Sequence, residues 1–259
     1  MKKIIVIVII LFIFLFVINR KNNSPLYISE EKAISIYEKQ PNIPEIDLII
    51  KKINASNVDI KTFSCQNFKI ELTKGVKFNL TGSVFMEKNN KFRMTIYNQL
   101  GGKELDAGSN DAVFWFWSKR IRPNLNQQKQ NEPNQFKSYI NPNWLILCMS
   151  FNEIDLKKSE IIKYKDFYGI IQTQPYGRVL ILIDPKKQLV IGHYLYDNYE
   201  KLISSAEIIS FQQVGKHTIP KQISIILHQE NTKIMCFLDG AVVNSRLSRS
   251  YWSMPRSFP

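Results

Sequence analysis

The feature that most constrains this chain is an alternation of apolar and polar residues, which begins near residue 58 and continues almost to the C-terminus. A period of two is typical of strands that bury one face. Turn residues separate the alternating stretches, and about eleven stretches follow one another, as in antiparallel meanders. Strand and helix patterns do not alternate, and no repeat of fixed period occurs, so a parallel sheet, a propeller and a solenoid are not expected. The sequence therefore predicts an α+β protein that is mostly antiparallel β.

Two stretches depart from this period and are predicted as helices. The first, residues 44–55, begins with a proline and carries acidic residues in its first turn, as the helix dipole favours. The second, residues 142–151, is apolar and lies between two sets of strands, and the polar residues 122–135 ahead of it predict a long loop. The first helix must pack against another element, because it has one apolar stripe, formed by Ile46, Ile49, Ile50 and Ile53.

The N-terminal segment predicts export. Two lysines precede an unbroken apolar run, residues 4–18. As a helix this run is about 22 Å long, shorter than a hydrocarbon core of about 30 Å, and it fits the apolar region of a secretory signal. No small-x-small cleavage site and no nearby cysteine follow, so residues 1–20 are either a signal peptide or an uncleaved anchor in the inner membrane. Residues 21–43 are predicted as a linker, and we expect residues 44–259 to lie in the periplasm or cell envelope.

The chain has a formal net charge of +13 and a pI near 9.5. Its lysines and arginines are scattered, which favours a solvated basic surface; the alternative is an affinity for anionic lipid head groups. Because the protein is predicted to be exported, nucleic acid is not expected as a partner. The three cysteines, Cys65, Cys148 and Cys236, are far apart. Three buried thiols are favoured, and one disulfide with a free thiol is the alternative.

The sequence contains no motif for catalysis, a metal or a cofactor. His193, His217 and His228 lack the spacing of metal ligands, and no nucleophile elbow or phosphate-binding loop occurs. Asp106 and Asp111 flank a predicted turn, and such carboxylate pairs are common without catalysis. We therefore expect the protein not to be an enzyme, and we expect neither a metal site nor a cofactor.

Four large aromatic residues stand in a row at positions 114–117. An apolar run of this kind indicates a strand with two apolar faces, and alternation sends Trp115 and Trp117 one way and Phe114 and Phe116 the other. We expect one face to meet a cavity and the other to meet a cover or a partner. The residues predicted to point inward, as cavity walls or as a solid core, are Phe68, Ile70, Phe78, Leu80, Phe92, Met94, Ile96, Trp115 and Trp117.

Several local motifs of this chain are similar to those of one known protein family. Residues 82–94, GSVFMEKNNKFRM, are similar to a strand-turn-strand in which the family has G-x-φ-x-φ-K-x-P-x-x-φ-R, where φ is apolar. Residues 109–117 place a Ser-Asn-Asp turn before the aromatic strand, where the family has an Asp-Gly turn before an apolar-Trp strand. Residues 183–193 and 219–221 are similar to a hairpin and a strand start of the family. The predicted elements also follow a distinctive order: an export signal, an amphipathic helix, a strand meander, a short central helix and a second strand meander. By this order and these motifs, residues 44–240 resemble the LolA/LolB-like lipoprotein carrier and sorting family.

The resemblance implies an incomplete, half-open antiparallel barrel, covered by short helices, whose hollow holds acyl chains. It implies that residues 44–259 form a lipid-binding domain of a non-catalytic envelope carrier or sorting factor. Its implied partners are the acyl chains of lipids or lipoproteins, the membrane surface and an envelope transport complex. Lys88 lies near the basic position that helps to close the family's lid, where this chain has Lys instead of Arg. The alternative is a membrane-anchored structural module of the same fold, with a solid core, that binds a protein partner.

Overall fold

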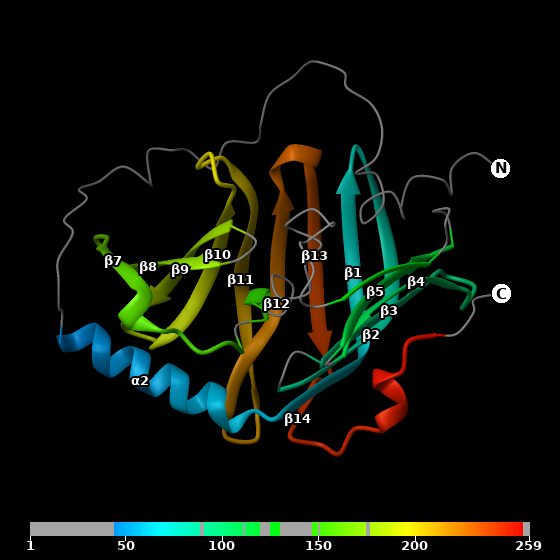
Figure 1. The fold of residues 1–259 in the computed structure, drawn as a ribbon, viewed down its shortest axis with the longest axis horizontal. Helices are drawn as coiled ribbons and strands as arrows, with labels where there is room; N and C mark the ends of the chain where they lie inside the picture. Colours follow the sequence, from blue (N-terminus) through cyan, green and yellow to red (C-terminus); the bar gives the residue numbers. More distant parts are fainter. Residues whose placement is uncertain are drawn as a thin grey trace.

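A computed structural model gives the fold of the chain (Figure 1). Residues 1–43, which hold the predicted signal or anchor at 4–18 and the linker at 21–43, lie outside the described residues, as does most of the helix predicted at 142–151. Among the residues that the structure describes, no helix has the length and apolar character needed to cross a membrane. The described residues are 44–88, 91–110, 112–119, 125–129, 147–149, 151–174 and 177–255.

The described strands form one antiparallel sheet of fourteen strands. Its order is β6-β5-β4-β3-β2-β1-β13-β12-β11-β10-β9-β8-β7, with β14 paired to β1, and no pairing in the described part of the chain joins the edge strands β6 and β7. The first meander comprises β1 (Thr62–Lys74), β2 (Val76–Glu87), β3 (Lys91–Tyr97), β4 (Lys103–Ser109), β5 (Val113–Ser118) and β6 (Leu125–Lys129). The remaining strands are β7 (Ser159–Lys163), β8 (Tyr168–Gln174), β9 (Gly177–Asp184), β10 (Leu189–Tyr196), β11 (Leu202–Val214), β12 (His217–Leu227), β13 (Thr232–Asp239) and β14 (Val242–Val243).

The two meanders meet at β1 and β13, which come from opposite ends of the described chain and lie side by side at the centre of the sheet (Figure 1). Residues 67–73 of β1 pair with residues 233–239 of β13 in unbroken antiparallel register. Together with the two-residue pairing of β14 with β1, this junction makes a single curved sheet from two local hairpin stacks.

The prediction of a mostly antiparallel, half-open sheet is confirmed, and the number of strands is larger than the eleven predicted. The three additional strands are β6, β7 and β14. The strand β6 lies within residues 122–135, which were predicted to form a loop because they are polar. It pairs with the aromatic strand β5 through residues 125–129 and so satisfies backbone groups that the β5 edge would otherwise leave open. β14 has two residues, too few for a periodic signal.

The predicted N-terminal helix is present as α2 (Pro44–Asp59). Its stripe of Ile46, Ile49, Ile50 and Ile53 is buried in the main hydrophobic core, as its spacing predicted. The helix runs one turn beyond residue 55, and in Figure 1 it lies along one end of the second meander. Its contacts agree with this place: Lys52 donates to Gln188 in the turn after β9, and Lys216, in the turn after β11, pairs with Asp59.

Two asparagines of α2 anchor the helix to the segment that leads into β7. Asn54 exchanges two hydrogen bonds with the backbone of Ile154, Nδ2 to O and N to Oδ1, both 2.9 Å long. Asn57 donates to the carbonyl of Asn152 over 2.9 Å. These side-chain hydrogen bonds to the backbone fix α2 against residues 152–154. The remaining short elements are the 3-10 turns η3 (Leu156–Lys158), η4 (His228–Glu230) and η5 (Arg249–Trp252).

Candidate functional site

One face of the sheet is apolar across both meanders and shares its core with the stripe of α2; we call it the inner face. Seven of the nine residues predicted to point inward lie on this face. Residues directly opposite each other in antiparallel strands point to the same side of the sheet, and the cross-strand pairs connect these seven residues to one another and to the core. The pairs are Ile70 with Leu80, Leu72 with Phe78, Val84 with Met94, Met86 with Phe92, and Gly82 with both Phe68 and Ile96. Phe78 and Leu80 are partly buried, and the other five predicted residues are buried.

Trp115 and Trp117 lie on the opposite face, which we call the outer face, so the prediction that they point inward is wrong. Trp115 stands opposite Gly108, which stands opposite Arg93. Phe116 stands opposite Ala107, which stands opposite Met94. Residues directly opposite each other in antiparallel strands point to the same side. The two phenylalanines therefore enter the inner core, and the two tryptophans are buried on the outer side.

The pairing of β5 with β4 decides which way the two tryptophans point. The sequence of β4 shows which of its faces is apolar, whereas both faces of the aromatic run are apolar. Leu105 and Ala107 are its apolar alternate residues, whereas Asp106 and Gly108 alternate with them. Gly108 leaves room for the indole of Trp115: a Cβ at Gly108 would lie 2.2 Å from Cζ2 of that ring. A glycine opposite a tryptophan thus marks the outer face, since no other residue type leaves space there.

A buried carboxylate holds the outer face together beneath Trp115. Asp106 is fully buried and accepts from Arg93 Nε at 3.1 Å, from Arg93 Nη2 at 2.7 Å and from Lys103 Nζ at 3.0 Å. The indole Nε1 of Trp115 donates to the same carboxylate over 3.3 Å. Since a buried charge is tolerated only when it is paired and hydrogen-bonded, this arrangement fixes the position of both cations.

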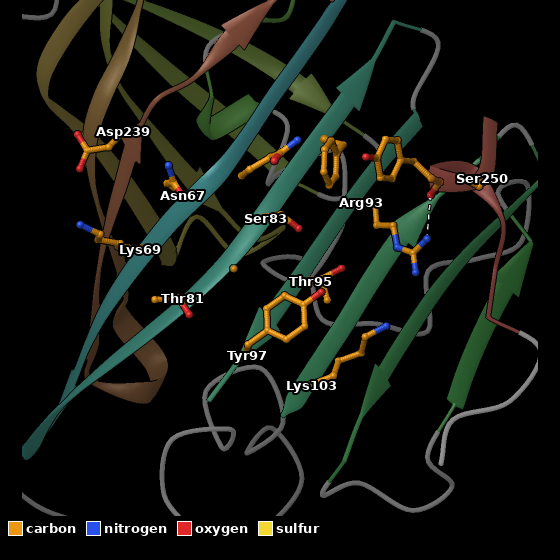
Figure 2. A pocket seen from close by; sticks show the side chains of 14 residues that line it. Asn67, Lys69, Thr81, Ser83, Arg93, Thr95, Tyr97, Lys103, Asp239 and Ser250 are labelled. Carbon is orange, nitrogen blue, oxygen red and sulfur yellow. Dashed lines mark hydrogen bonds between the residues drawn. The ribbon is translucent and has the colours of Figure 1, made fainter. Parts of the chain in front are cut away.

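An open pocket of about 890 Å³ lies on the outer face of the first meander (Figure 2); we call it the outer groove. Three parallel rows of side chains, each running across the strands, give the groove its shape. The middle row has Ser83 and Thr95, which are small, so it lies lower than the rows on either side. The first flanking row is Lys69, Thr81, Tyr97 and Lys103, and the second begins with Phe85 and Arg93.

The C-terminal turn η5 forms one rim of the outer groove. Tyr251 stacks on Phe85 with ring centroids 4.1 Å apart, and its carbonyl accepts from Arg93 Nη1 over 3.2 Å. Trp252 donates from Nε1 to Glu87 over 3.0 Å. The tail thus docks through ring stacking and side-chain donors rather than through strand pairing. Figure 2 places Arg93 and Ser250 together at this rim.

Lys88 lies at the end of β2, where it faces the segment that anchors α2. Its Nζ is 3.4 Å from Glu153 Oε1, and both side chains are partly exposed, so the pair contributes about 0 to 1 kcal/mol. Glu153 precedes Ile154, the residue that Asn54 of α2 binds. Lys88 therefore connects the first meander to the segment beneath the helix, whereas a role in closing a lid stays a prediction.

The inner face also contains polar and thiol groups. Burial lowers the pKa of His193 to about 3, so the ring is neutral at pH 7. Ser204 is fully buried on β11, and its Oγ has no hydrogen-bond partner in the described part of the chain. All three cysteines are buried free thiols; burial raises the pKa of Cys65 to about 11 and that of Cys236 to about 12. These thiols are therefore protonated and act as small apolar groups.

Two observations bear on whether the described residues could support catalysis. Within the described ranges, no three His, Cys, Asp or Glu side chains gather closely enough to hold a metal ion. Ser205 Oγ lies 3.0 Å from His228 Nε2, a distance typical of a nucleophile and its base. Ser205 is 2% exposed, however, so its hydroxyl is closed to substrate and the pair acts as a structural hydrogen bond.

No family model and no curated protein matches the sequence. Solved structures do share the fold. A DUF1329 family protein from Desulfovibrio piger has a TM-score of 0.56 at 10% identity, over 81% of this chain and 95% of that one. An outer membrane lipoprotein-sorting domain from Vibrio parahaemolyticus has a TM-score of 0.54 at 9% identity, over 79% and 94% of the two chains.

A LolA superfamily protein from Nitrosomonas europaea has a TM-score of 0.55 at 8% identity, over 80% of this chain and 97% of that one. Each of these structures is matched over nearly its whole length, so the likeness covers the complete sheet rather than one hairpin stack. At these identities the likeness concerns the fold alone, and it agrees with the resemblance found in the sequence motifs. The chain therefore has a LolA/LolB-like fold: an open antiparallel barrel with a helix at its apolar face.

Proposed function

We propose that residues 44–259 form a non-catalytic carrier or sorting domain of the cell envelope that binds acyl chains of lipids or lipoproteins on the inner face. The observation that carries the proposal is the continuity of this face. Its apolar side chains run from Phe92 and Met94 in the first meander, across the β1–β13 junction, to Ile181 in the second. A curved apolar face of this length suits a long hydrocarbon chain.

The energetics of transfer agree with such a role. Each methylene moved from water to an apolar site gains about 0.8 kcal/mol, so a long acyl chain gains roughly 10 kcal/mol. That is enough to keep a lipid out of the membrane without a covalent bond. Met94 suits a surface that accepts chains of different shape, because its side chain is unbranched and adaptable.

Insertion of an acyl chain requires α2 to move, because its isoleucine stripe packs on the inner face. The polar contacts of α2 that must open include the paired hydrogen bonds of Asn54 with Ile154, the hydrogen bonds of Asn57, Lys52 and Glu45, and the ion pair of Asp59 with Lys216. The ion pair of Lys88 with Glu153, the residue before Ile154, opens with them. None of these contacts is a strand pairing, so the helix can open while the sheet stays intact. Lys88 then has the lid role predicted for it, because its ion pair with Glu153 opens together with α2.

The predicted apolar run at residues 4–18 and the fold support a place in the cell envelope, with the domain tethered to the inner membrane or released by cleavage. One structure of the same fold is assigned to outer membrane lipoprotein sorting. The membrane surface and an envelope transport complex are the partners that such a role requires.

Photo-cross-linking of the full chain with a diazirine-bearing fatty acid tests this function. Peptide mass spectrometry should place the adducts on inner-face residues such as Phe68, Ile70, Phe92 and Met94, and none on the outer groove. Ala107→Phe, which adds bulk beside Met94, should lower uptake, whereas Ile209→Phe, at an exposed position, should not. If Ala107→Phe does not fold, as judged by circular dichroism, the adduct map of the unmodified chain still decides.

The second candidate is a membrane-anchored structural module with a solid core that binds a protein partner. The close burial of the inner face favours it: Phe92 is 1% exposed and Met94 4%. This module takes up no fatty acid, and its adducts are absent or scattered over exposed surface. The cross-linking experiment therefore separates the two candidates directly.

A further inference from the structure

The outer groove brings cations to two of its walls. Lys69 and Lys103 stand at the two ends of one cross-strand row, and Arg93 stands on the opposite wall (Figure 2). With strands about 4.8 Å apart, the backbones of the two lysines are about 14 Å apart across three strand spacings. Thr81 and Tyr97 stand between them in the row, so a small ligand that both long lysine side chains reach lies over these two residues.

The groove also keeps a positive excess. Its three cations face two carboxylates, Asp106 and Asp239. Asp106 is fully buried and stands opposite Thr95 in the middle row, where it orients Arg93 and Lys103 but neutralises only one of them. Lys69 is exposed and has no ion-pair partner among the residues that the structure describes.

The floor of the groove differs chemically from its walls. Ser83 and Thr95 on the floor, and Thr81 in the first flanking row beside them, place hydroxyl-bearing side chains between the cations. Hydroxyls donate and accept, as the hydroxyls of a polyol require, whereas Lys and Arg bind phosphate oxygens. The volume of about 890 Å³ lies within the range of small-molecule sites, about 300 to 1,000 Å³.

We propose that the outer groove binds a phosphate ester of a polyol, with the phosphate held by Lys69 and Lys103 and the hydroxyls held on the threonine and serine floor. Ligands of this class include a free glycerol phosphate and the head group of phosphatidylglycerol. The site is separate from the inner face, because the two lie on opposite sides of the sheet. It therefore does not rest on the proposed acyl binding.

Calorimetric titration of the full chain with glycerol 1-phosphate tests the soluble form of the ligand. Lys69→Gln should weaken binding about tenfold, equivalent to about 1.4 kcal/mol, and Thr95→Val should weaken it without changing the charge. The matched control is Lys201→Gln, which removes the same charge from an exposed turn outside the groove. Equal weakening by both lysine variants would overturn the proposal, because the binding would then depend on net charge alone.

Vesicle flotation tests the lipid head group. Full chain without detergent is mixed with phosphatidylcholine vesicles that contain or lack phosphatidylglycerol. Lys69→Gln should reduce the gain in binding that phosphatidylglycerol gives, and Lys201→Gln should not. A Lys69-dependent effect in calorimetry assigns the site to soluble esters, and one in flotation alone assigns it to the lipid. No Lys69-dependent effect in either assay would overturn the proposal.

Fatty-acid cross-linking of Lys69→Gln should stay unchanged, which separates this result from the function of the inner face.

Discussion

At the scale of single residues, the sheet depends on places where a missing side chain makes room for a large one. Gly108 and Trp115 are the clearest pair, since Trp115 is fully buried and its indole occupies the space of a Cβ at Gly108. The alternation within residues 114–117 predicted two opposed faces correctly but not which face is which. That choice depends on the register with β4, which is a property of two strands together.

The first prediction concerns this pair. Gly108→Ala should lower the free energy of unfolding by about 1 to 3 kcal/mol, because the added methyl group meets a rigid buried ring. In a Trp115→Leu background the same substitution should cost clearly less, since the smaller side chain leaves space. Urea unfolding of the four proteins measures the coupling. Equal costs in both backgrounds would show that the ring does not limit this position.

The second prediction concerns His193, whose pKa burial lowers to about 3. In the unfolded chain its pKa returns to about 6.5, so between these values the unfolded state binds a proton that the folded state does not. Stability should therefore fall as the pH drops from about 6 towards 3, by about 1.4 kcal/mol per pH unit from this residue. His193→Met should flatten the plot of unfolding free energy against pH in this window. An unchanged slope would mean that His193 is already charged, or is not buried, in the folded protein.

At the scale of elements, α2 is an amphipathic helix whose two sides should differ sharply. Ile50 is 2% exposed in the core, whereas Leu48 is 62% exposed on the same helix. Ile50→Ala should lower the free energy of unfolding by about 2 to 4 kcal/mol, and Leu48→Ala should change it by less than about 0.5 kcal/mol. Thermal or urea unfolding of the two variants gives the comparison. Similar effects of both substitutions would indicate that α2 does not pack on the inner face.

Elements with a strong period were predictable from the sequence. The isoleucine stripe of α2 and the alternating runs of β1, β3 and β9 bury the residues that their spacing predicted. β6 was missed because its residues are polar, and its pairing comes from the open edge of β5. The outer groove was missed for a related reason. It requires Ser83 to stand opposite Thr95, between rows that only the register aligns.

At the scale of the whole molecule, the order of elements predicted the fold better than any motif did. Two local meanders fold from neighbouring hairpins, and the long-range pairing of β1 with β13, extended by that of β1 with β14, joins them. Because this pairing is antiparallel and in register, the inner face continues from one meander to the other. The two faces of the sheet therefore differ in chemistry: the inner face is apolar, and the outer groove is polar.

The central claim is that the inner face takes up hydrocarbon chains and is not merely a core. Native mass spectrometry of the full chain, purified from cell envelopes in a detergent that is removed in the gas phase, tests it most directly. A ladder of masses shifted by those of acyl lipids, and lost in Ala107→Phe but not in Ile209→Phe, is the predicted result. A single ligand-free mass for the folded protein, with no adduct after incubation with phospholipid, would contradict it.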